Sequence, residues 1–210
     1  MRLFSYFRST AAWRVRIGLF WKGLAFETVP VDLRRGAQTS PAWLARNPQG
    51  LVPALELADG TLLTQSLAIL EWLEETVPRP PLLPETPRAR AEARSLALLI
   101  AADVHPVQNL RVLQRVEALA GPESARAWAA AVIDEGLRAF EARIAGLPGP
   151  FSLGAAPTLA DVCLVPQLAN ARRFGVDLQG FSRLLGVEAA CAALPAFQSA
   201  RPEAQPDHAP

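Results

Sequence analysis

The chain has 210 residues, of which half are hydrophobic and a fifth are charged, so it can bury a sizeable core and has room for two domains. Its 21 basic and 20 acidic residues nearly balance, which removes the electrostatic argument for binding nucleic acid or an anionic membrane. The apolar start is too short for a signal-peptide core, and no apolar run approaches the ~20 residues of a membrane span. Cys163 and Cys191 have neither disulfide-framework nor zinc-site spacing. These features predict a protein of the reducing cytoplasm without a metal site.

Seven elements are predicted before residue 78, in the order strand, helix, strand, helix, strand, strand, helix. They cover residues 2–7, 9–23, 26–31, 41–46, 53–57, 61–64 and 67–75. A hydroxyl at Ser9 or Thr10 opens the first helix, and Gly23 ends it. An Asp-Gly pair at 59–60 marks a hairpin turn between the last two strands. The first strand–helix–strand unit implies a parallel pair with a right-handed crossover, to which the hairpin adds an antiparallel edge.

Five prolines between residues 78 and 87 mark a stiff linker, because proline cannot continue a helix and restricts the residue before it. From Ala89 onward the chain is rich in strong helix formers, and nothing there has the pattern of a strand. We therefore expect an α+β domain over residues 1–78, a linker over 79–88 and an all-helical domain over 89–210.

The helical part has its own local signals. One buried stripe at helical spacing is predicted from Trp128, Val132, Ile133, Leu137, Phe140, Ile144 and Leu147. Thr158 and Asp161 form a T-x-x-D capping box, which predicts a helix over residues 162–174. The stretch from Pro202 is polar and proline-rich, and we expect it to be frayed.

Two segments of the first domain have the chemistry to hold a peptide-like ligand. A cis bond at Val52-Pro53 would leave the Val52 backbone groups available to an extended ligand, although about nineteen X-Pro bonds in twenty are trans. Ser66 stands where the third helix should be capped, and Gln65 precedes it, so both are placed to bind a carboxylate. A plain helix N-cap explains Ser66 equally well.

Arg8, Ser9 and Thr10 form the turn between the first strand and the first helix. A hydroxyl there can donate to a thiolate or carboxylate, and a helix N-terminus lowers the pKa of a thiol from about 8.5. Arg8 has the geometry to hold a ligand carboxylate by two contacts. Helix capping and solvated arginines explain the same residues without any ligand.

Together with later segments, these residues form motifs that resemble those of the zeta-class glutathione transferases. The motifs are R-S-T-x-x-W-R-V-R-I from Arg8, N-P-x-G-x-V-P-A-L from Asn47, T-Q-S-L-A-I-L-E-W-L-E-E from Thr64, H-P-V-Q-N-L-R-V-L from His105 and T-L-A-D-V-C-L-V-P-Q from Thr158. The resemblance covers about residues 2–207 and implies the glutathione transferase fold. In that fold a thioredoxin-like domain precedes an all-α domain.

The resemblance also implies a role for individual residues. Those implied to bind glutathione are Ser9, Thr10, Gln38, Val52, Pro53, Gln65, Ser66 and Asn109. Ser9 is implied to approach the sulfur and Gln38 to contact the glycyl end. The Val52 backbone is implied to pair with the cysteinyl unit, beside a cis Pro53. Gln65 and Ser66 are implied to hold the γ-glutamyl carboxylate.

The catalytic set implied by the resemblance adds Arg8, His105, Arg111 and Arg173 to the first-turn hydroxyls. Arg173 matches an arginine that the family directs at the substrate carboxylate, whereas His105 and Arg111 look more like the maleylpyruvate branch. Solvated helix-face charges also explain both arginines, and a histidine before proline often only packs or caps. Ala11 stands where the family commonly has a cysteine, so the thiolate of added glutathione must carry the chemistry.

The function implied by the resemblance is glutathione-dependent cis–trans isomerisation of a small diacid. The substrate is maleylacetoacetate or maleylpyruvate, the product is the fumaryl isomer, and the setting is the catabolism of tyrosine and phenylalanine or of gentisate. Glutathione is then a cofactor, and a homodimer is implied. Two alternatives stay open: a general transferase acting on electrophiles or haloacids, and a non-catalytic binding module. A module of that kind would be expected to lose the thiol-site residues present here, although the fold alone does not decide.

Overall fold

A computed structural model describes residues 1–209 of the chain, which divides into two compact units. The sheet unit comprises Met1–Pro81 together with the residues from Ala193 onward, and the helical unit is Leu82–Ala192. This division differs from the expected boundaries at the C-terminal end. The last segment packs with the sheet, whereas its helix-forming composition had placed it in the helical domain.

The sheet unit contains four strands and four α-helices within the described residues. They are β1 (Arg2–Ser5), α1 (Thr10–Trp21), β2 (Glu27–Pro30), α2 (Pro41–Arg46), β3 (Ala54–Glu56), β4 (Leu62–Thr64), α3 (Ser66–Thr76) and α8 (Pro195–Ser199). Short 3₁₀ turns lie at η1 (Leu33–Arg35), η2 (Ala37–Thr39) and η5 (Pro202–Ala204). The predicted order of strands and helices up to α3 is confirmed, with strands shorter than expected because pairing is lost at their ends.

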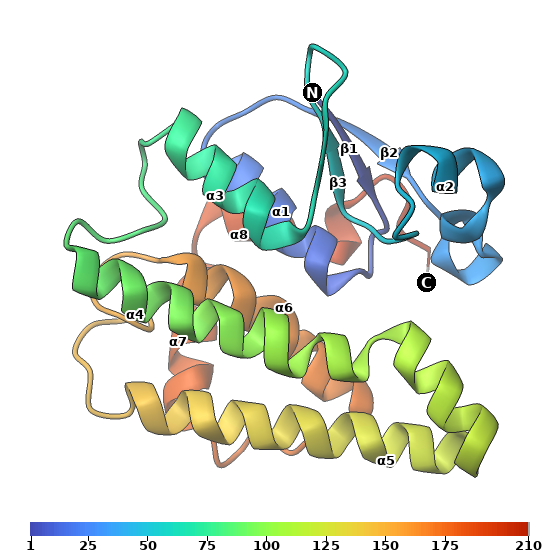
Figure 1. Cartoon of the computed structure of the whole chain (residues 1–210). Coiled ribbons are helices and arrows are strands. Elements are labelled where there is room, and N and C mark those ends of the chain that lie inside the picture. The colour runs from blue at the N-terminus through green and yellow to red at the C-terminus, as the bar shows by residue number, and fades with distance from the viewer. Residues whose placement is uncertain (210) are drawn as a thin grey trace. The chain divides into compact units, whose positions relative to one another are not determined.

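The sheet has the strand order β2-β1-β3-β4, in which β1 is parallel to β2 and β3 is antiparallel to both of its neighbours. Side chains alternate across it, so Leu3 and Phe4 face opposite sides. Phe4 packs on Trp43 of α2, with ring centroids 4.9 Å apart. Helices α1 and α3 lie together on the other side (Figure 1). They approach closely at Gly18, where an added Cβ would lie 2.3 Å from Leu70.

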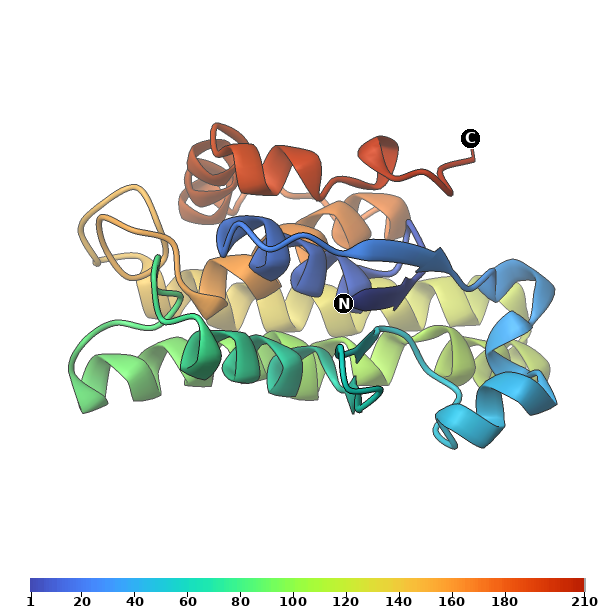
Figure 2. The ribbon, with the colours of Figure 1, turned by 90° about the horizontal axis from the view of Figure 1, so that it is seen from above.

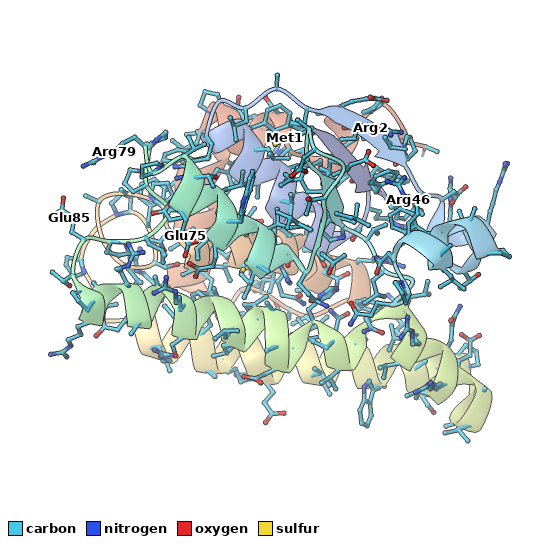
Figure 3. The ribbon with its side chains drawn as sticks, turned by 45° about the horizontal axis from the view of Figure 1, so that its top comes forward. Met1, Arg2, Arg46, Glu75, Arg79 and Glu85 are labelled. Atoms are coloured by element: carbon cyan, nitrogen blue, oxygen red, sulfur yellow. The ribbon has the colours of Figure 1, made fainter. Side chains whose placement is uncertain are left out.

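Charged side chains also join neighbouring elements of the sheet unit. Figure 3 labels Arg2 of β1 and Arg46 of α2, and both donate to the carboxylate of Glu56 on β3. The guanidinium of Arg46 also lies 4.6 Å from the centroid of the Phe4 ring. These contacts hold α2 against the strands that it covers.

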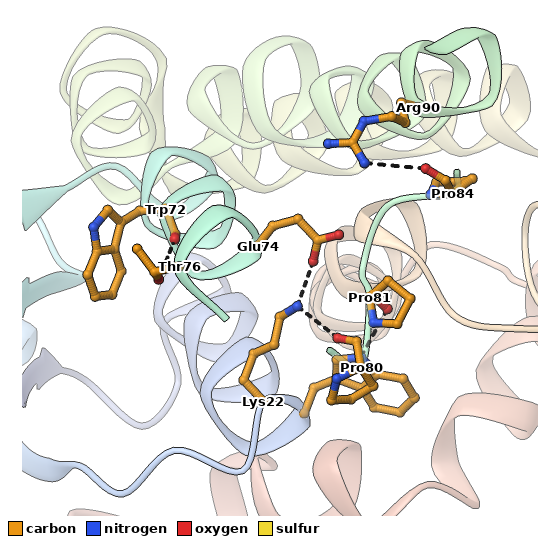
Figure 4. Close-up of polar contacts among 9 residues, drawn as sticks. Lys22, Trp72, Glu74, Thr76, Pro80, Pro81, Pro84 and Arg90 are labelled. Atoms are coloured by element: carbon orange, nitrogen blue, oxygen red, sulfur yellow. Dashed lines mark hydrogen bonds and ion pairs between the residues drawn. The ribbon is translucent and has the colours of Figure 1, made fainter. Parts of the chain in front are cut away.

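A buried ion pair joins α1 to α3. The Lys22 ammonium, with its side chain fully buried, lies 2.6 Å from Oε2 of Glu74, which is 6 % exposed. Lys22 also donates to the carbonyl of Pro80 at 2.7 Å, as Figure 4 shows. This cluster fastens the proline-rich segment to the sheet unit.

The helical unit consists of α4 (Pro87–Leu98), a π-helical turn η3 (Leu99–Val104), a 3₁₀ turn η4 (Pro106–Gln108), α5 (Leu110–Ile144), α6 (Leu159–Phe174) and α7 (Ser182–Ala192). Helix α6 packs against α4, α5 and α7 and is buried over most of its length. Helix α5 is interrupted at Gly121, where φ is 86°, and resumes at Pro122. Glycine permits this left-handed conformation, and proline suits the first turn that follows.

The capping box at Thr158 and Asp161 is confirmed. The Asp161 carboxylate accepts hydrogen bonds from the backbone N–H of Thr158 at 2.7 Å and of Ser152 at 2.8 Å. The predicted stripe on α5 is right at its centre, where Ile133, Leu137, Phe140 and Ile144 are buried. It is wrong at its ends, since Trp128 is 45 % and Leu147 39 % exposed. Trp128 instead donates through its indole N–H to the carbonyl of Val107 at 3.0 Å.

The stretch Pro87–Ile144 is long and apolar enough to cross a membrane by length and composition alone. It is not one continuous helix, however. α4 has 12 residues, turns of other kinds follow it, and the backbone at Asn109 is extended. A membrane-spanning helix needs about 20 residues with every backbone group paired internally, so the breaks count against a span before α5.

The segment from Pro202, expected to be frayed, is ordered through Ala209 and held against the sheet unit. Helix α8 lies beside α1 in two views of the ribbon (Figures 1 and 2). Gln205 is buried, and its side-chain amide donates to the carbonyls of Ser199 and Arg201 at 2.9 and 2.8 Å. These bonds from the Gln205 side chain to backbone carbonyls attach the polar, proline-rich segment to the end of α8.

Candidate functional site

Four segments of the sheet unit meet at one end of the sheet. Ser5, at the end of β1, pairs with Pro30 at the end of the parallel strand β2. Ala54, at the start of the antiparallel strand β3, pairs with Phe4 of β1 and with Thr64 at the end of β4. The topology therefore gathers the turns that follow β1, β2 and β4, and the loop before β3. All the site residues predicted in the sheet unit lie on these four segments.

The turn after β1 carries Arg8, Ser9 and Thr10. Ser9 is the N-cap of α1, and its Oγ accepts a hydrogen bond from the backbone N–H of Ala12 at 3.2 Å. Its hydroxyl proton takes no part in that bond and is therefore available to a second acceptor, since a hydroxyl both donates and accepts. Thr10 is buried, whereas Arg8 is exposed and its guanidinium lies 5.9 Å from the Phe7 ring centroid. The predicted N-cap is confirmed at Ser9 and not at Thr10.

The loop before β3 is braced by Asn47, which is buried and whose side-chain amide donates to the carbonyl of Leu51 at 2.8 Å. The Val52–Pro53 peptide bond is cis. Gly50 has φ of 63°, and a Cβ there would lie 3.0 Å from the carbonyl oxygen of Gln38. Glycine at position 50 thus lets the 3₁₀ turn that carries Gln38 approach the loop.

The turn after β4 differs from its prediction. Gln65, and not Ser66, is the N-cap of α3, and Ser66 is the first residue of that helix. The Ser66 hydroxyl is buried and accepts a hydrogen bond from the Arg14 guanidinium of α1 at 3.4 Å. Gln65 has φ of 68°, a left-handed conformation that is uncommon outside glycine and is associated with ligand sites. Its amide donates to the side chain of Gln49 at 2.8 Å.

This end of the sheet fits an extended peptide that carries carboxylates. No hydrogen bond engages the backbone of Val52 within residues 1–209. Over the same residues the side-chain carbonyl oxygen of Gln38 is buried without a hydrogen-bond partner, although a buried acceptor is normally paired. The N-termini of α1 and α3 both open onto this end, and the free N–H groups there favour anions.

The helical unit carries the other predicted residues: His105, Asn109, Arg111 and Arg173. Asn109 is the N-cap of α5, and its side-chain oxygen accepts from the Val112 N–H at 3.1 Å. Beside it, the side chain of Gln108 accepts a hydrogen bond from the amide of Asn170 on α6 at 2.9 Å, and both are buried. This bond joins the start of α5 to the last turns of α6.

Arg111 and Arg173 each lie three residues beyond one member of the Gln108–Asn170 pair, and both are exposed. Arg111 is in the first turn of α5, which contains no acidic residue. A cation there is unfavourable beside the positive end of the helix dipole. His105 is half-buried and follows the π-helical turn.

Sequence reasoning missed the residues that support the site. Arg14 is 1 % exposed, and Asn47 and Gln49 brace the loop and the turn described above. An arginine inside the apolar run of α1 was a usable signal for Arg14, because a buried charge needs a partner. No local pattern pointed to the contact between Gln49 and Gln65, which depends on the hairpin bringing the two turns together.

Comparison with known families matches most of both units. A model of the glutathione S-transferase N-terminal domain matches residues 8–76, and a model of the C-terminal domain matches residues 92–200. Maleylacetoacetate isomerase from Rhizobium meliloti is 50 % identical over 205 residues, which cover 96 % of this chain and 95 % of that protein.

Two solved structures are similar over the whole length of the chain. One is a holo structure of maleylpyruvate isomerase, described as a bacterial zeta-class glutathione S-transferase. It is 42 % identical, has a TM-score of 0.96, and the match covers 100 % of both chains. The other is maleylacetoacetate isomerase from Anaeromyxobacter dehalogenans with glutathione in its active site. It is 50 % identical, has a TM-score of 0.92, and the match covers 99 % of this chain and 97 % of that one.

Proposed function

Because this chain belongs to the zeta class of the glutathione S-transferase family, we propose that it is a glutathione-dependent cis–trans isomerase of a maleyl keto acid. The substrate is maleylacetoacetate or maleylpyruvate, and the product is its fumaryl isomer. The observation that carries the proposal is the convergence of Ser9, Val52–Pro53 and Gln65 at one end of the sheet. It occurs in a chain half identical to a maleylacetoacetate isomerase.

When bound, glutathione supplies a thiolate that adds reversibly to the cis double bond, which allows rotation to the trans form before the thiolate leaves. In the proposal, the Ser9 hydroxyl and the N–H groups of α1 stabilise negative charge at the sulfur. Gln65 and the first turn of α3 hold the γ-glutamyl carboxylate. Val52 pairs with the cysteinyl backbone, and the unpaired Gln38 oxygen accepts from the glycyl N–H. Thr10 lines the same turn.

In the proposal, the substrate carboxylates and the charge that develops on the keto acid are held by arginine. Guanidinium groups suit this role because they bind carboxylates by two parallel hydrogen bonds and stay charged. Arg111, Arg173 and Arg8 are the candidates, all exposed in their own units, and His105 and Asn109 lie close in sequence to Arg111. No reacting cysteine is needed, since Ala11 occupies the turn and Cys163 and Cys191 are buried.

The proposal is tested by the ultraviolet absorbance of maleylpyruvate and, separately, maleylacetoacetate, mixed with the purified protein with and without glutathione. We expect conversion to the fumaryl isomer only when glutathione is present. If both compounds are inert, while a chlorinated acid or aromatic electrophile is consumed with loss of free thiol, the protein is a general transferase. If none reacts although glutathione binds, it is a non-catalytic module.

Replacement of either arginine should weaken catalysis by removing a charge-assisted contact to the substrate. We expect Arg111→Ala and Arg173→Ala each to lower kcat/KM by roughly 10- to 100-fold, mainly through KM for the maleyl compound, with glutathione affinity unchanged. Arg172→Ala is the matched control, because Arg172 is exposed on the same helix as Arg173 and its guanidinium is bound to Glu188 at 2.6 Å. Equal losses in all three variants would assign the effect to the helix and not to a substrate contact.

The strained turn of α3 gives a second prediction. Gln65→Gly relieves a left-handed conformation that costs about 1–3 kcal/mol, although glycine also gives the unfolded chain more freedom, which offsets part of the gain. We expect unchanged or higher thermal stability together with about tenfold weaker glutathione binding by calorimetry. Gln49→Ala, which keeps the backbone of Gln65, should weaken binding less. Lower stability with full affinity in Gln65→Gly would contradict a ligand-holding role.

We also propose that the enzyme acts as a homodimer in the cytoplasm. Exposed Leu44 and Leu51 flank the loop that carries Val52, and neighbouring apolar side chains on a surface favour association. Light scattering should then give twice the chain mass of 22.6 kDa. A mass of one chain at micromolar concentration would refute the dimer without affecting the proposed reaction.

A further inference from the structure

The C-terminal segment makes a direct bond to the turn that carries Ser9. The backbone N–H of Phe7 donates to Oδ2 of Asp207 at 2.8 Å, across 200 residues of sequence. The His208 ring meets the Phe7 ring edge to face, with centroids 5.3 Å apart. Phe7 is buried and stands two residues before Ser9, so this contact fixes the chain just where it leaves β1 for α1.

Arg16 of α1 holds the same stretch of backbone from the other side. It is fully buried, and its guanidinium donates to the carbonyl of Phe7 at 2.8 Å, to that of Tyr6 at 3.4 Å and to the Ser5 hydroxyl at 3.0 Å. Its Nε donates to the carbonyl of Ala200 at 3.0 Å. Burial lowers the pKa of Arg16 to about 10, and the negative charge of Asp207 opposes that shift. Arg16 therefore stays cationic at neutral pH, with Asp207 as its counter-charge.

The segment that carries Asp207 is held together by its own backbone hydrogen bonds. The backbone N–H of Gln205 donates to Pro202 at 3.1 Å, and that of His208 donates to Gln205 at 3.0 Å. The guanidinium groups of Arg8 and Arg34 also lie near Phe7, each 5.9 Å from its ring centroid, and Arg34 is paired with Asp32 at 3.6 Å. Asp207 therefore reaches the Phe7 amide from a turn that its own backbone bonds hold in place.

We propose that Asp207 is a positioning residue, which together with Arg16 sets the turn Phe7–Arg8–Ser9 so that the Ser9 hydroxyl and the first N–H groups of α1 face the thiol of the bound substrate or cofactor. The inference rests on the proposed function only in taking that thiol to be glutathione. Under this proposal Asp207, close to the C-terminal end of the sequence, contributes to the stability of the thiolate bound near Ser9. A general negative charge near the site would act in the opposite sense, because it disfavours a thiolate.

The test compares Asp207→Ala with Asp207→Asn, which loses the charge but keeps an acceptor oxygen. The first readout is hydrogen exchange at the Phe7 amide, followed by NMR without ligand. The second is the pKa of the glutathione thiol in the binary complex, from the ultraviolet absorbance of the thiolate. In Asp207→Ala we expect about tenfold faster exchange at Phe7 and about a tenfold smaller thiolate fraction at neutral pH. Asp207→Asn should restore most of both.

Asp59→Ala is the matched control, since Asp59 also accepts one backbone N–H, from Thr61 at 2.9 Å, but is exposed in the hairpin turn of β3 and β4. It should leave both readouts unchanged. A thiolate fraction in Asp207→Ala equal to or larger than in the parent protein would overturn the inference, whatever happens to stability. A parent protein that binds no glutathione would overturn it together with the proposed function. Binding without isomerisation would overturn the proposed function alone.

Discussion

Ser9→Ala should lower kcat of the isomerisation by about 10²–10³, the range seen when one donor to a developing anion is removed. Ser9 is the N-cap of α1, and its oxygen already accepts from Ala12, so its proton is the part available to a thiolate. Loss of that donor raises the thiol pKa, so the rate–pH profile should move to higher pH. Loss of the cap should also lower the free energy of unfolding by about 1 kcal/mol.

The two effects of Ser9 separate in a matched variant. Ser9→Thr keeps both the capping oxygen and the hydroxyl proton, so we expect near-native rates and stability. The measurement is kcat across a range of pH, together with thermal unfolding of each variant. If Ser9→Ala loses stability but retains more than half of the activity with an unmoved pH profile, Ser9 is a helix cap only.

The second large effect concerns the buried pair of Lys22 and Glu74. Removing one partner of a buried ion pair leaves an uncompensated charge and typically costs about 3–5 kcal/mol. We therefore expect this loss for Lys22→Met and for Glu74→Leu, whose side chains are 0 % and 6 % exposed in the parent protein. The double variant Lys22→Met with Glu74→Leu should recover most of the loss, because two apolar side chains of similar size need no partner.

Urea denaturation of the four proteins measures the coupling between the two sites. Arg138→Met serves as the control, since Arg138 pairs with Asp134 on the exposed face of α5 and exposed pairs contribute little. If the double variant is as unstable as the sum of the single variants, the two side chains act independently. In that case the bond from Lys22 to the Pro80 carbonyl carries the stability.

The parts of the fold that sequence predicted are those with local causes. The Ser9 cap and the Thr158–Asp161 box each depend on residues within one turn, and both formed as expected. Ser66 was misplaced by one position because its hydroxyl pairs with Arg14, 52 residues earlier, instead of capping its own helix. The α5 stripe failed at Trp128, where a bond to the Val107 carbonyl holds the indole at the surface.

The grouping of the predicted sheet-unit residues at one end of the sheet could be anticipated from the sequence, but the contacts that support them could not. The motifs match those of the family in the same order along the chain, and those of the sheet unit lie at one end of the sheet. No short stretch of the sequence predicts the left-handed backbone of Gln65 or the bond from Phe7 to Asp207. Both are set by contacts between segments far apart in sequence.

The division of the sheet unit between the two ends of the chain has a consequence during protein synthesis. Residues 1–81 leave the ribosome first, but the carbonyl of Ala200 and the carboxylate of Asp207, which pair with Arg16 and Phe7, lie beyond the whole helical unit. At about 5–20 residues per second, the nascent sheet waits several seconds or more for them. During that interval Arg16 lacks the carbonyl of Ala200 and the counter-charge of Asp207, so the turn from Phe7 to Ser9 gains its last supporting contacts only after the helical unit has been made.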